Sequence, residues 1–264
     1  MPKTILITGS TDGIGLATAK MLASKGHNIL LHGRNSKKLE EAKQALSGAG
    51  LVEGFLADLS HIDEVESLAK SVAADHPKLD VLINNAGVFS TPNPVTEDGL
   101  DIRFVVNTIA PYLLTQRLLP LLGTTGRVIS LSSAAQAPVD LDALSGRVSL
   151  SDNEAYAQSK LALTMWSRSL ALSLGDSGPV LVAVNPGSFL GSKMVKEAYG
   201  KEGKDLRIGA DILTRAALSD EFAAASGEYF DNDSGRFASL HPDALDENKL
   251  RELVRVIETQ LAAN

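Results

Sequence analysis

Hydrophobic and polar positions along this chain follow two alternating patterns. Short runs rich in β-branched residues or leucine are separated by longer stretches in which apolar residues recur every three or four positions. The short runs predict buried strands, and the longer stretches predict amphipathic helices. The expected strands are 3–8, 28–32, 51–57, 79–84, 126–132 and 179–185, and the expected helices are 14–24, 36–46, 62–74, a long one within 98–122, 152–174 and 246–263.

The order of these elements predicts the fold class. Strands that are apolar throughout and alternate with helices are typical of a parallel sheet covered on both faces. Right-handed crossovers then give a doubly wound, Rossmann-like α/β sheet with a ligand crevice at the carboxyl ends of its strands. No linker interrupts the pattern, so we expect 1–264 to form a single domain. The long connections 134–150 and 188–220 follow strands on the crevice side, and we interpret them as substrate-loop insertions.

Composition limits the kinds of ligand and the cellular compartment that we expect for this protein. The net charge of −7 and the low pI of about 5.3 argue against nucleic acid or an anionic membrane as a partner. The most apolar long stretch, 104–122, contains Asn107, Gln116 and Arg117, so we expect no membrane span. The chain has no cysteine, which fits a reducing cytoplasm, and its five histidines show no metal-ligand spacing. We therefore expect a cytoplasmic protein without a bound metal.

Three glycines lie between the first expected strand and the first expected helix. Gly9, Gly13 and Gly15 have the spacing Gly-x-x-x-Gly-x-Gly within the segment TGSTDGIG. Glycine permits a tight turn there, and it lets the backbone approach a pyrophosphate at the helix N-terminus. The alternative is a plain strand-to-helix turn. The position directly after the first strand favours a dinucleotide site.

Tyr156 and Lys160 are four residues apart on an expected helix, so their side chains share one helix face. A phenol with a pKa of about 10 is a poor proton donor near neutrality, and a neighbouring cation lowers that pKa. Ser151 and Glu154 form a plausible capping box at the start of this helix. The Tyr-x-x-x-Lys spacing also arises by chance on surface helices, so the other motifs of the chain decide its meaning.

Seven short motifs follow one another at compatible spacing. They are Thr8–Gly15, Asp58-Leu59, Asn84–Gly87, Asn107, Ser132-Ser133, Tyr156 with Lys160, and Pro186-Gly187. In this order they resemble the short-chain dehydrogenase/reductase family over nearly the whole chain. Ser133 and Tyr156 are 23 positions apart, and this long gap is similar to that of the retinol-dehydrogenase-like branch.

The resemblance implies a set of catalytic residues. Tyr156 would give a proton to a carbonyl oxygen or take one from an alcohol, and Lys160 would lower the phenol pKa and bind the nicotinamide ribose. Ser133 would hydrogen-bond the reacting oxygen, and Asn107 would anchor a water that links the lysine to solvent. The choice of Ser133 over Ser132 rests on the analogy alone. Without it, the two serines would be a polar strand end and Asn107 a buried amide.

The resemblance also implies a cofactor site. Its residues would be Gly9, Ser10, Thr11, Asp12, Gly13, Ile14, Gly15, Arg34, Asn35, Asp58, Leu59, Asn85, Ala86, Gly87, Tyr156, Lys160, Pro186, Gly187 and Ser188. The second strand ends without the Asp or Glu that would favour NAD, and Arg34 could bind a 2′-phosphate. NADP(H) is therefore favoured, and NAD is the alternative. Arg34 as an ordinary exposed loop arginine is the competing interpretation.

Together these features predict an NAD(P)-dependent oxidoreductase that transfers a hydride between the cofactor and a small-molecule carbonyl or alcohol. The apolar segments 137–150 and 189–199 favour a hydrophobic substrate, and the resemblance allows a homo-oligomer.

Two other functions compete with the oxidoreductase function. The first is a non-catalytic dinucleotide-sensing scaffold. The second is a serine hydrolase, because 175–179 reads GDSGP, although Gly175 is better interpreted as the glycine that ends a helix.

Overall fold

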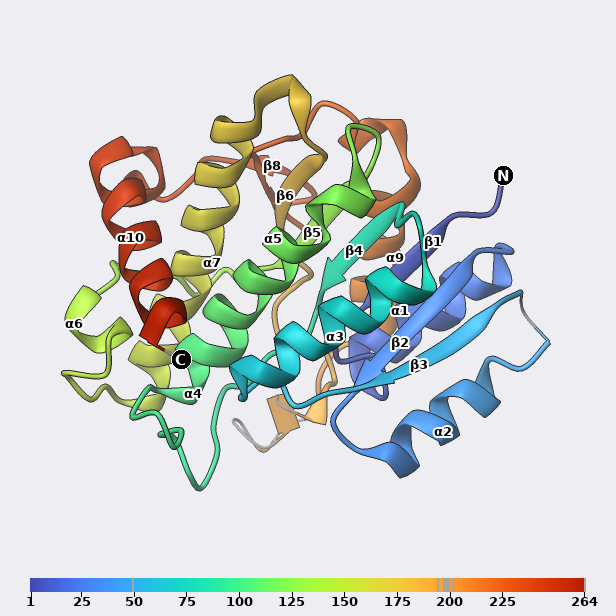
Figure 1. Ribbon diagram of the computed structural model, residues 1–264, viewed down its shortest axis with the longest axis horizontal. Coiled ribbons are helices and arrows are strands. Elements are labelled where there is room, and N and C mark those ends of the chain that lie inside the picture. The colour runs from blue at the N-terminus through green and yellow to red at the C-terminus, as the bar shows by residue number, and fades with distance from the viewer. Residues whose placement is uncertain (49, 194, 197–199, 201, 264) are drawn as a thin grey trace.

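One twisted sheet runs through the centre of the molecule (Figure 1). The computed structural model describes residues 1–263 except 49, 194, 197–199 and 201. In these residues, eight strands pair in the order β3-β2-β1-β4-β5-β6-β7-β8. They are β1 (Thr4–Ile7), β2 (Asn28–Gly33), β3 (Val52–Leu56), β4 (Val81–Asn84), β5 (Arg127–Leu131), β6 (Val180–Asn185), β7 (Tyr229–Asp231) and β8 (Arg236–Ala238). All neighbours are parallel except β7 and β8, which confirms the doubly wound α/β fold.

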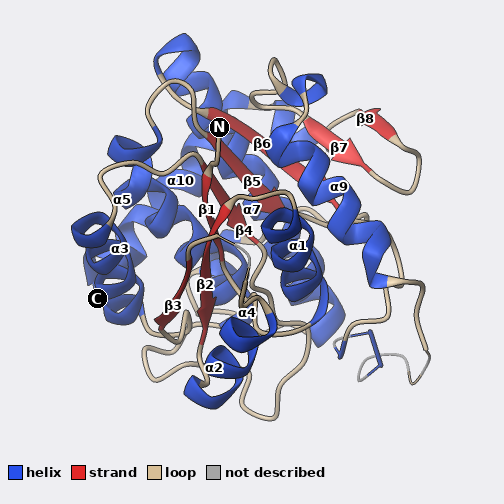
Figure 2. Ribbon diagram, turned by 90° about the vertical axis from the view of Figure 1, so that its right-hand side faces the viewer, coloured by secondary structure: helices blue, strands red, loops and turns tan. Residues whose placement is uncertain are grey.

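Helices cover both faces of the sheet, as Figure 2 shows. They are α1 (Gly13–Ser24), α2 (Ser36–Ala45), α3 (Ile62–Asp75), α4 (Ile102–Phe104), α5 (Ala110–Leu122), α6 (Leu141–Leu144), α7 (Asp152–Leu174), α9 (Leu206–Leu218) and α10 (Glu247–Ala263). Short 3₁₀ turns lie at Gly175–Ser177, Asp220–Phe222 and Pro242–Leu245. Side chains alternate along each strand, so Ile5 and Ile7 join the core under α1 and α9, while Leu6 joins the core under α3, α5 and α7.

The chain changes direction across the sheet between β1 and β4. From β1 it builds outward through β2 and β3, then returns to β4 and builds the other way. The connections after β1 and β4 therefore leave in opposite directions, and a crevice opens between them at the carboxyl ends of the strands. The motifs at Thr8–Gly15 and Asn84–Gly87 both lie at this point.

Helix α7 has the bounds that the sequence predicts. The Ser151 hydroxyl accepts a bond from the Glu154 N–H, and the Glu154 carboxylate accepts one from the Ser151 N–H, which confirms the capping box. At the other end, Gly175 has a positive φ of 50° and terminates the helix. Ser177 follows in an exposed turn, so GDSGP is the end of a helix here.

The segment expected as one long helix within 98–122 is divided. A turn of α4 passes into a π-helical turn, η1 (Val105–Ile109), and then into α5. Single π turns interrupt α-helices where a side chain must be re-aimed, frequently at functional sites. Asn107 is in the middle of this turn and is completely buried. The interruption is invisible in the hydrophobic pattern because all five residues of η1 are buried.

Helix α9 and strands β7 and β8 were not predicted from the sequence. All of α9 falls within the expected insertion 188–220, five of whose residues (194, 197–199 and 201) lie outside the described residues. The buried face of α9 carries Ile212 and Leu213 among small residues, so an apolar helical period was available in the sequence and was overlooked. A Cβ at Gly209 would lie 2.7 Å from Leu190, so this helix packs closely over the crevice side. The segment 134–150 contains α6.

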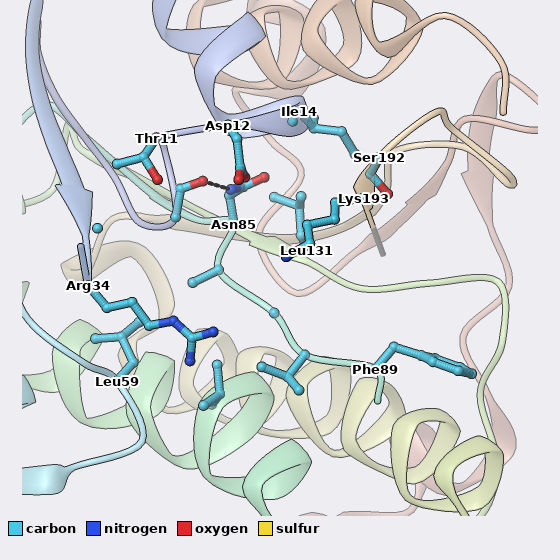
Figure 3. Close-up of a pocket in the computed structure, with 18 of the residues that line it drawn as sticks. Thr11, Asp12, Ile14, Arg34, Leu59, Asn85, Phe89, Leu131, Ser192 and Lys193 are labelled. Atoms are coloured by element: carbon cyan, nitrogen blue, oxygen red, sulfur yellow. Dashed lines mark hydrogen bonds between the residues drawn. The ribbon is translucent and has the colours of Figure 1, made fainter. Parts of the chain in front are cut away.

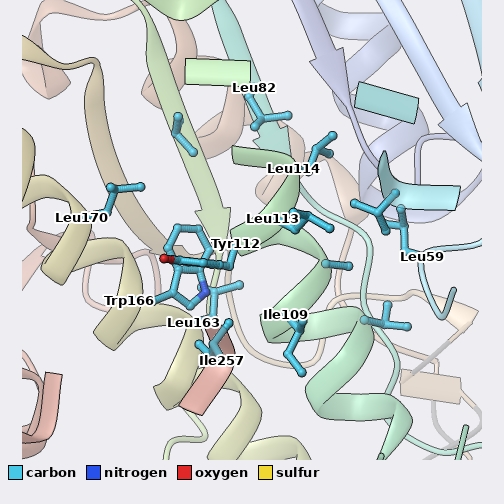
Figure 4. Packing of buried hydrophobic residues seen from close by; sticks show 14 of the residues in the cluster. Leu59, Leu82, Ile109, Tyr112, Leu113, Leu114, Leu163, Trp166, Leu170 and Ile257 are labelled. Atoms are coloured by element: carbon cyan, nitrogen blue, oxygen red, sulfur yellow. The ribbon is translucent and has the colours of Figure 1, made fainter. Parts of the chain in front are cut away.

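Two features stabilise the face of the molecule that carries α7. Tyr112 on α5 and Trp166 on α7 pack edge to face with ring centroids 5.6 Å apart (Figure 4). Helix α10 covers them with Leu253 and Ile257, as expected of its apolar face, and Glu258 accepts a bond from the Tyr112 hydroxyl at 2.9 Å. The C-terminal helix is thereby joined to the two helices beneath it.

A buried arginine ties three segments together near the start of α7. The Arg103 side chain is only 1% exposed. Its Nε and Nη2 donate to Asp101 at 2.7 and 2.5 Å, and its Nη1 donates to Asp152 in the first turn of α7. Asp152 also accepts a 2.8 Å bond from the Ser90 hydroxyl. The Ser90 bond and the Arg103 guanidinium lower the pKa of Asp152, so it stays ionised.

We predict that Arg103→Met lowers the free energy of unfolding by about 3 kcal/mol, because it leaves the Asp101 and Asp152 carboxylates without their cation. Urea denaturation followed by Trp166 fluorescence would measure the change. Arg251→Met is the control, since its ion pair with Glu247 is 67% and 79% exposed, and such pairs contribute less than about 1 kcal/mol. Equal losses in the two variants would contradict the prediction.

Candidate active site

A cavity of about 650 Å³ opens at the carboxyl ends of the central strands (Figure 3). Most residues proposed from the sequence line it, although they come from segments far apart in the chain. Those that line it are Gly9, Thr11, Asp12, Gly13, Ile14, Gly15, Arg34, Asn35, Asp58, Leu59, Asn85, Ala86, Gly87, Tyr156, Lys160 and Pro186. Ser10, Asn107, Ser133, Gly187 and Ser188 do not line it. The fold thus brings both expected ends of a dinucleotide site into one cavity.

The glycine loop leaves no room for side chains at two of its positions. A Cβ at Gly15 would come within 2.5 Å of the Asn85 side-chain nitrogen, and still closer to the Gly9 carbonyl oxygen. Gly9 has a φ of 62°, and a Cβ there would lie 2.9 Å from the Ala86 backbone. Both glycines are therefore required by the packing itself. The result is a bare backbone surface at the N-terminus of α1, which fits a pyrophosphate.

Asn85 and Thr8 lock this loop onto the end of β4. The Asn85 side chain donates to the carbonyl oxygens of Thr8 and Gly9 at 2.8 and 2.9 Å. In return, the Thr8 hydroxyl accepts bonds from the backbone N–H groups of Asn85 and Ala86, both at 3.0 Å. These reciprocal bonds bridge the switch point of the sheet. They explain why the two motifs occur together in this chain.

His32 is a structural residue of the site that sequence reasoning missed. It is 3% exposed, its Nδ1 accepts a bond from the Gly9 N–H at 3.0 Å, and its Nε2 donates to the Ala57 carbonyl at 3.0 Å. Burial lowers the pKa of His32 to about 4, so the ring is neutral and can make both bonds. A histidine inside an apolar strand is a usable signal, because a buried polar group needs partners.

The far end of the cavity carries two cations, each paired with a carboxylate that also lines it. The Arg34 side chain extends from the end of β2 into the space beside Leu59 (Figure 3), and it is 66% exposed. Its guanidinium is 3.8 Å from the Asp58 carboxylate. Lys38, which the sequence analysis did not single out, also lines the cavity and pairs with Asp12 at 3.0 Å. Lys38 lies four residues after Arg34, and this spacing in the sequence could have drawn attention to a second cation near the end of β2.

Asp58 is held as a carboxylate beside Arg34. Burial opposes its ionisation, but bonds from the Ser60 N–H and hydroxyl, together with the Arg34 charge, lower the pKa of Asp58. The two Ser60 bonds are 3.0 and 2.7 Å long. A carboxylate fixed in this way can accept a hydrogen bond from a ligand amino group.

Tyr156 and Lys160 project from α7 into the opposite end of the cavity. The Lys160 Nζ lies 5.6 Å from the centroid of the Tyr156 ring, and Phe89 packs against the same ring with centroids 5.1 Å apart. Lys160 is 4% exposed, and its Nζ donates to the Leu131 carbonyl at 2.7 Å. Burial lowers the pKa of Lys160 to about 8. The ammonium is therefore mostly charged at neutral pH, and it can favour a phenolate next to it.

The two serines after β5 have different environments. The Ser132 hydroxyl is 2.8 Å from the Thr164 hydroxyl and 3.3 Å from the Lys160 carbonyl, so it is engaged by α7. The Ser133 hydroxyl accepts a bond from the Ala135 N–H at 3.1 Å. Its own proton has no acceptor in the part of the chain that the structure describes. Although Ser132 and not Ser133 lines the cavity, only Ser133 has a hydroxyl proton left to donate.

Asn107 lies behind the cavity wall. Its Oδ1 accepts from the Val88 N–H at 2.8 Å, and its Nδ2 donates to the Val88 carbonyl and to the Ser159 hydroxyl, both at 2.9 Å. The amide thus joins the π turn to α7 and to the loop after β4. Ser159 is adjacent to Lys160, so this network fixes the part of α7 that carries the lysine.

The turn after β6 is anchored away from the cavity. Pro186 lines the cavity, while the Ser188 hydroxyl and N–H donate to Asp233. Ser192 and Lys193 line the cavity further along the chain. The structure thus brings Pro186, but not Gly187 or Ser188, to the cavity surface.

Comparison with known proteins identifies the family. The family model for short chain dehydrogenases matches residues 3–203, and the chain therefore belongs to this family. Retinol dehydrogenase 13 of Homo sapiens is 33% identical over 273 residues, which cover 95% of this chain and 82% of the relative. This similarity confirms the predicted retinol-dehydrogenase-like branch.

Solved structures agree with this assignment. An uncharacterized protein from Mycobacterium paratuberculosis has a TM-score of 0.82 and 28% identity, covering 99% of this chain and 96% of its own. A metagenomic short-chain oxidoreductase in complex with NADP has a TM-score of 0.63 and 29% identity, covering 81% and 90%. Among the described residues, every helix is too short or too polar to cross a bilayer.

We predict that His32 makes the stability of this protein sensitive to acid. Its unfolded pKa is 6.5 and its folded pKa is about 4, so between these values only the unfolded chain binds the proton. The contribution of neutral His32 to the free energy of unfolding is therefore fully present above pH 6.5. It falls by up to about 3 kcal/mol as the pH is lowered to 4. His32→Asn should flatten this slope in urea denaturation series, whereas His61→Asn, at an exposed position, should not. A His32→Asn slope that matches the parent would contradict the prediction.

Proposed function

We propose that this protein is an NADP(H)-preferring oxidoreductase that interconverts a carbonyl and an alcohol. The observation that carries the proposal is that one cavity holds the glycine loop at one end and the Tyr156–Lys160 pair at the other. The glycine loop suits a dinucleotide pyrophosphate, and the pair suits proton transfer. Membership of the short-chain dehydrogenase family agrees with this chemistry.

The residues of the chain manage the proton and the orientation of the substrate. When bound, the nicotinamide cofactor supplies or accepts the hydride. The Tyr156 hydroxyl gives its proton to the carbonyl oxygen during reduction and takes it back during oxidation. The Lys160 ammonium stabilises the phenolate that forms, and the Ser133 hydroxyl donates to the same oxygen. Asn107 anchors a water that connects the lysine to solvent, and the π turn around it supports this role.

The preference for NADP(H) rests on the two cations at the far end of the cavity. Arg34 and Lys38 both line it, and an arginine binds a phosphate through two parallel hydrogen bonds. The similar metagenomic oxidoreductase was crystallised with NADP. At the opposite end, the wall contains Val88, Phe89, Pro92, Ile102 and Val106, which favours a hydrophobic substrate.

We predict that Tyr156→Phe lowers kcat about 100- to 10,000-fold, because general acid–base catalysis contributes on this scale. The dissociation constant for NADPH should stay unchanged, since the ring and its contact with Phe89 remain. The experiment first screens apolar aldehydes and ketones for oxidation of NADPH by the parent, and then compares the variant on the best substrate. NADPH binding without turnover of any substrate by the parent would favour the sensing scaffold.

We predict that Arg34→Ala raises KM for NADPH about 10- to 100-fold through loss of a charge-assisted phosphate contact. KM for NADH should change little, since NADH lacks the 2′-phosphate. Lys38→Ala should act in the same direction. Lys37→Ala is the control, because this neighbouring lysine does not line the cavity. An unchanged ratio of kcat/KM for the two cofactors in Arg34→Ala would refute the assignment.

A further inference from the structure

Strand β7 reaches the candidate active site from beyond the part of the chain that the family model matches, which ends at residue 203. Tyr229, its first residue, pairs with Ala183 of β6, and β6 separates it from β5. The Tyr229 hydroxyl nevertheless donates to the carbonyl oxygen of Ser133, just after β5, at 3.1 Å. A side chain two strands away thus holds the backbone of the proposed catalytic serine.

The Ser133 carbonyl accepts a second bond in the same place. Gln136 Nε2 donates to it at 2.9 Å and also lies 3.4 Å from the Ser132 hydroxyl. Two donors on one carbonyl oxygen fix the plane of the following peptide. The rotamers open to a side chain depend on the backbone angles that this plane fixes, so the two bonds restrict where the Ser133 hydroxyl points.

Tyr229 is suited to act as a permanent donor. Its side chain is buried, with 7% exposure, and this burial, followed by the Asp231 charge, raises the pKa of Tyr229 above its ordinary value. The phenol therefore keeps its proton throughout the neutral range. If the bond to Ser133 were broken, a buried hydroxyl would lose its acceptor, and that loss opposes movement of the serine loop.

We propose that Tyr229 is a positioning residue that acts through Ser133 and aims its hydroxyl at the reacting oxygen. The inference rests on the proposed function, in which Ser133 binds that oxygen. It adds a residue that neither the sequence motifs nor the matched family region contains.

The residues just after Tyr229 hold the turn after β6, from which Pro186 lines the cavity, in a similar way. Asp233 accepts bonds from the Ser188 N–H at 2.9 Å and from the Ser188 hydroxyl at 2.5 Å. The buried Asn185 side chain donates to Asp231 at 2.8 Å and to Asp233 at 2.9 Å, and it accepts from the Gly187 N–H at 3.2 Å. The segment 229–233 therefore supports both the serine loop and the turn after β6.

Tyr229→Phe tests the proposal by removing the hydroxyl while leaving the ring. We expect kcat to fall about 10- to 100-fold with KM for NADPH unchanged, because misplacement of a catalytic group by a fraction of an ångström has effects on this scale. Tyr112→Phe is the matched control. Tyr112 is also buried, and its hydroxyl donates to Glu258 and accepts from Gln116, but it lies on α5 outside the cavity lining. We expect this control to retain the parental kcat.

A double-mutant cycle separates positioning from a general loss of stability. If Tyr229 acts through Ser133, Tyr229→Phe should have almost no further effect on kcat in a Ser133→Ala background. Multiplicative effects of the two substitutions would overturn the proposal. A parental kcat in Tyr229→Phe would overturn it as well, and so would equal losses of kcat in Tyr229→Phe and Tyr112→Phe.

Hydrogen exchange supplies a readout that needs no turnover. We expect the amides of Ser132 and Ala135, bonded to Val184 and to the Ser133 hydroxyl, to exchange at least about tenfold faster in Tyr229→Phe than in Tyr112→Phe. Unchanged exchange would overturn the positioning role even if the parent were active. If the parent showed no turnover, the proposed function would fail. Faster exchange confined to Tyr229→Phe would still show that the Tyr229–Ser133 hydrogen bond restrains the serine loop.

Discussion

The candidate active site is organised around one buried charged amine, that of Lys160. Lys160 is 4% exposed, and its position depends on contacts from several directions. The Leu131 carbonyl accepts from its ammonium, Thr164 and Ser132 join its helix to β5, and the Asn107–Ser159 bond holds the turn before it. A solvated lysine would influence a neighbouring phenol only weakly, because water screens the charge. Burial makes the charge effective at the distance observed.

Much of the fold and part of the site could be predicted from local sequence patterns. The glycine spacing and the Tyr-x-x-x-Lys pair lie within single turns of chain, and α7 with its capping box was predicted to the residue. The parts that were missed depend on distant partners. His32 joins Gly9 to Ala57, and Tyr229 joins β7 to Ser133, so neither role is visible in neighbouring residues. Strands of three residues, such as β7, are too short to show a period.

The wall of the cavity opposite the glycine loop is tied to the same helix as Tyr156 and Lys160. Phe89 contacts the Tyr156 ring, and the adjacent Ser90 donates to Asp152 at the start of α7. Arg103 then joins Asp152 to the cap of α4. This wall and the tyrosine are therefore joined by a continuous set of contacts. A change in the loop after β4 would be transmitted to the phenol through α7.

The position of Tyr229 in the chain has a consequence for biosynthesis. A ribosome releases 1–203 before 229, so the nascent chain already contains every recognisable motif while the tyrosine that holds the Ser133 carbonyl is still being translated. The central strands can pair during this interval, while the Ser133 carbonyl still lacks the bond from Tyr229. Formation of the cavity and fixing of its serine loop are thus separate events in time, and the second waits for β7, a strand of three residues that lies next to the edge strand β8.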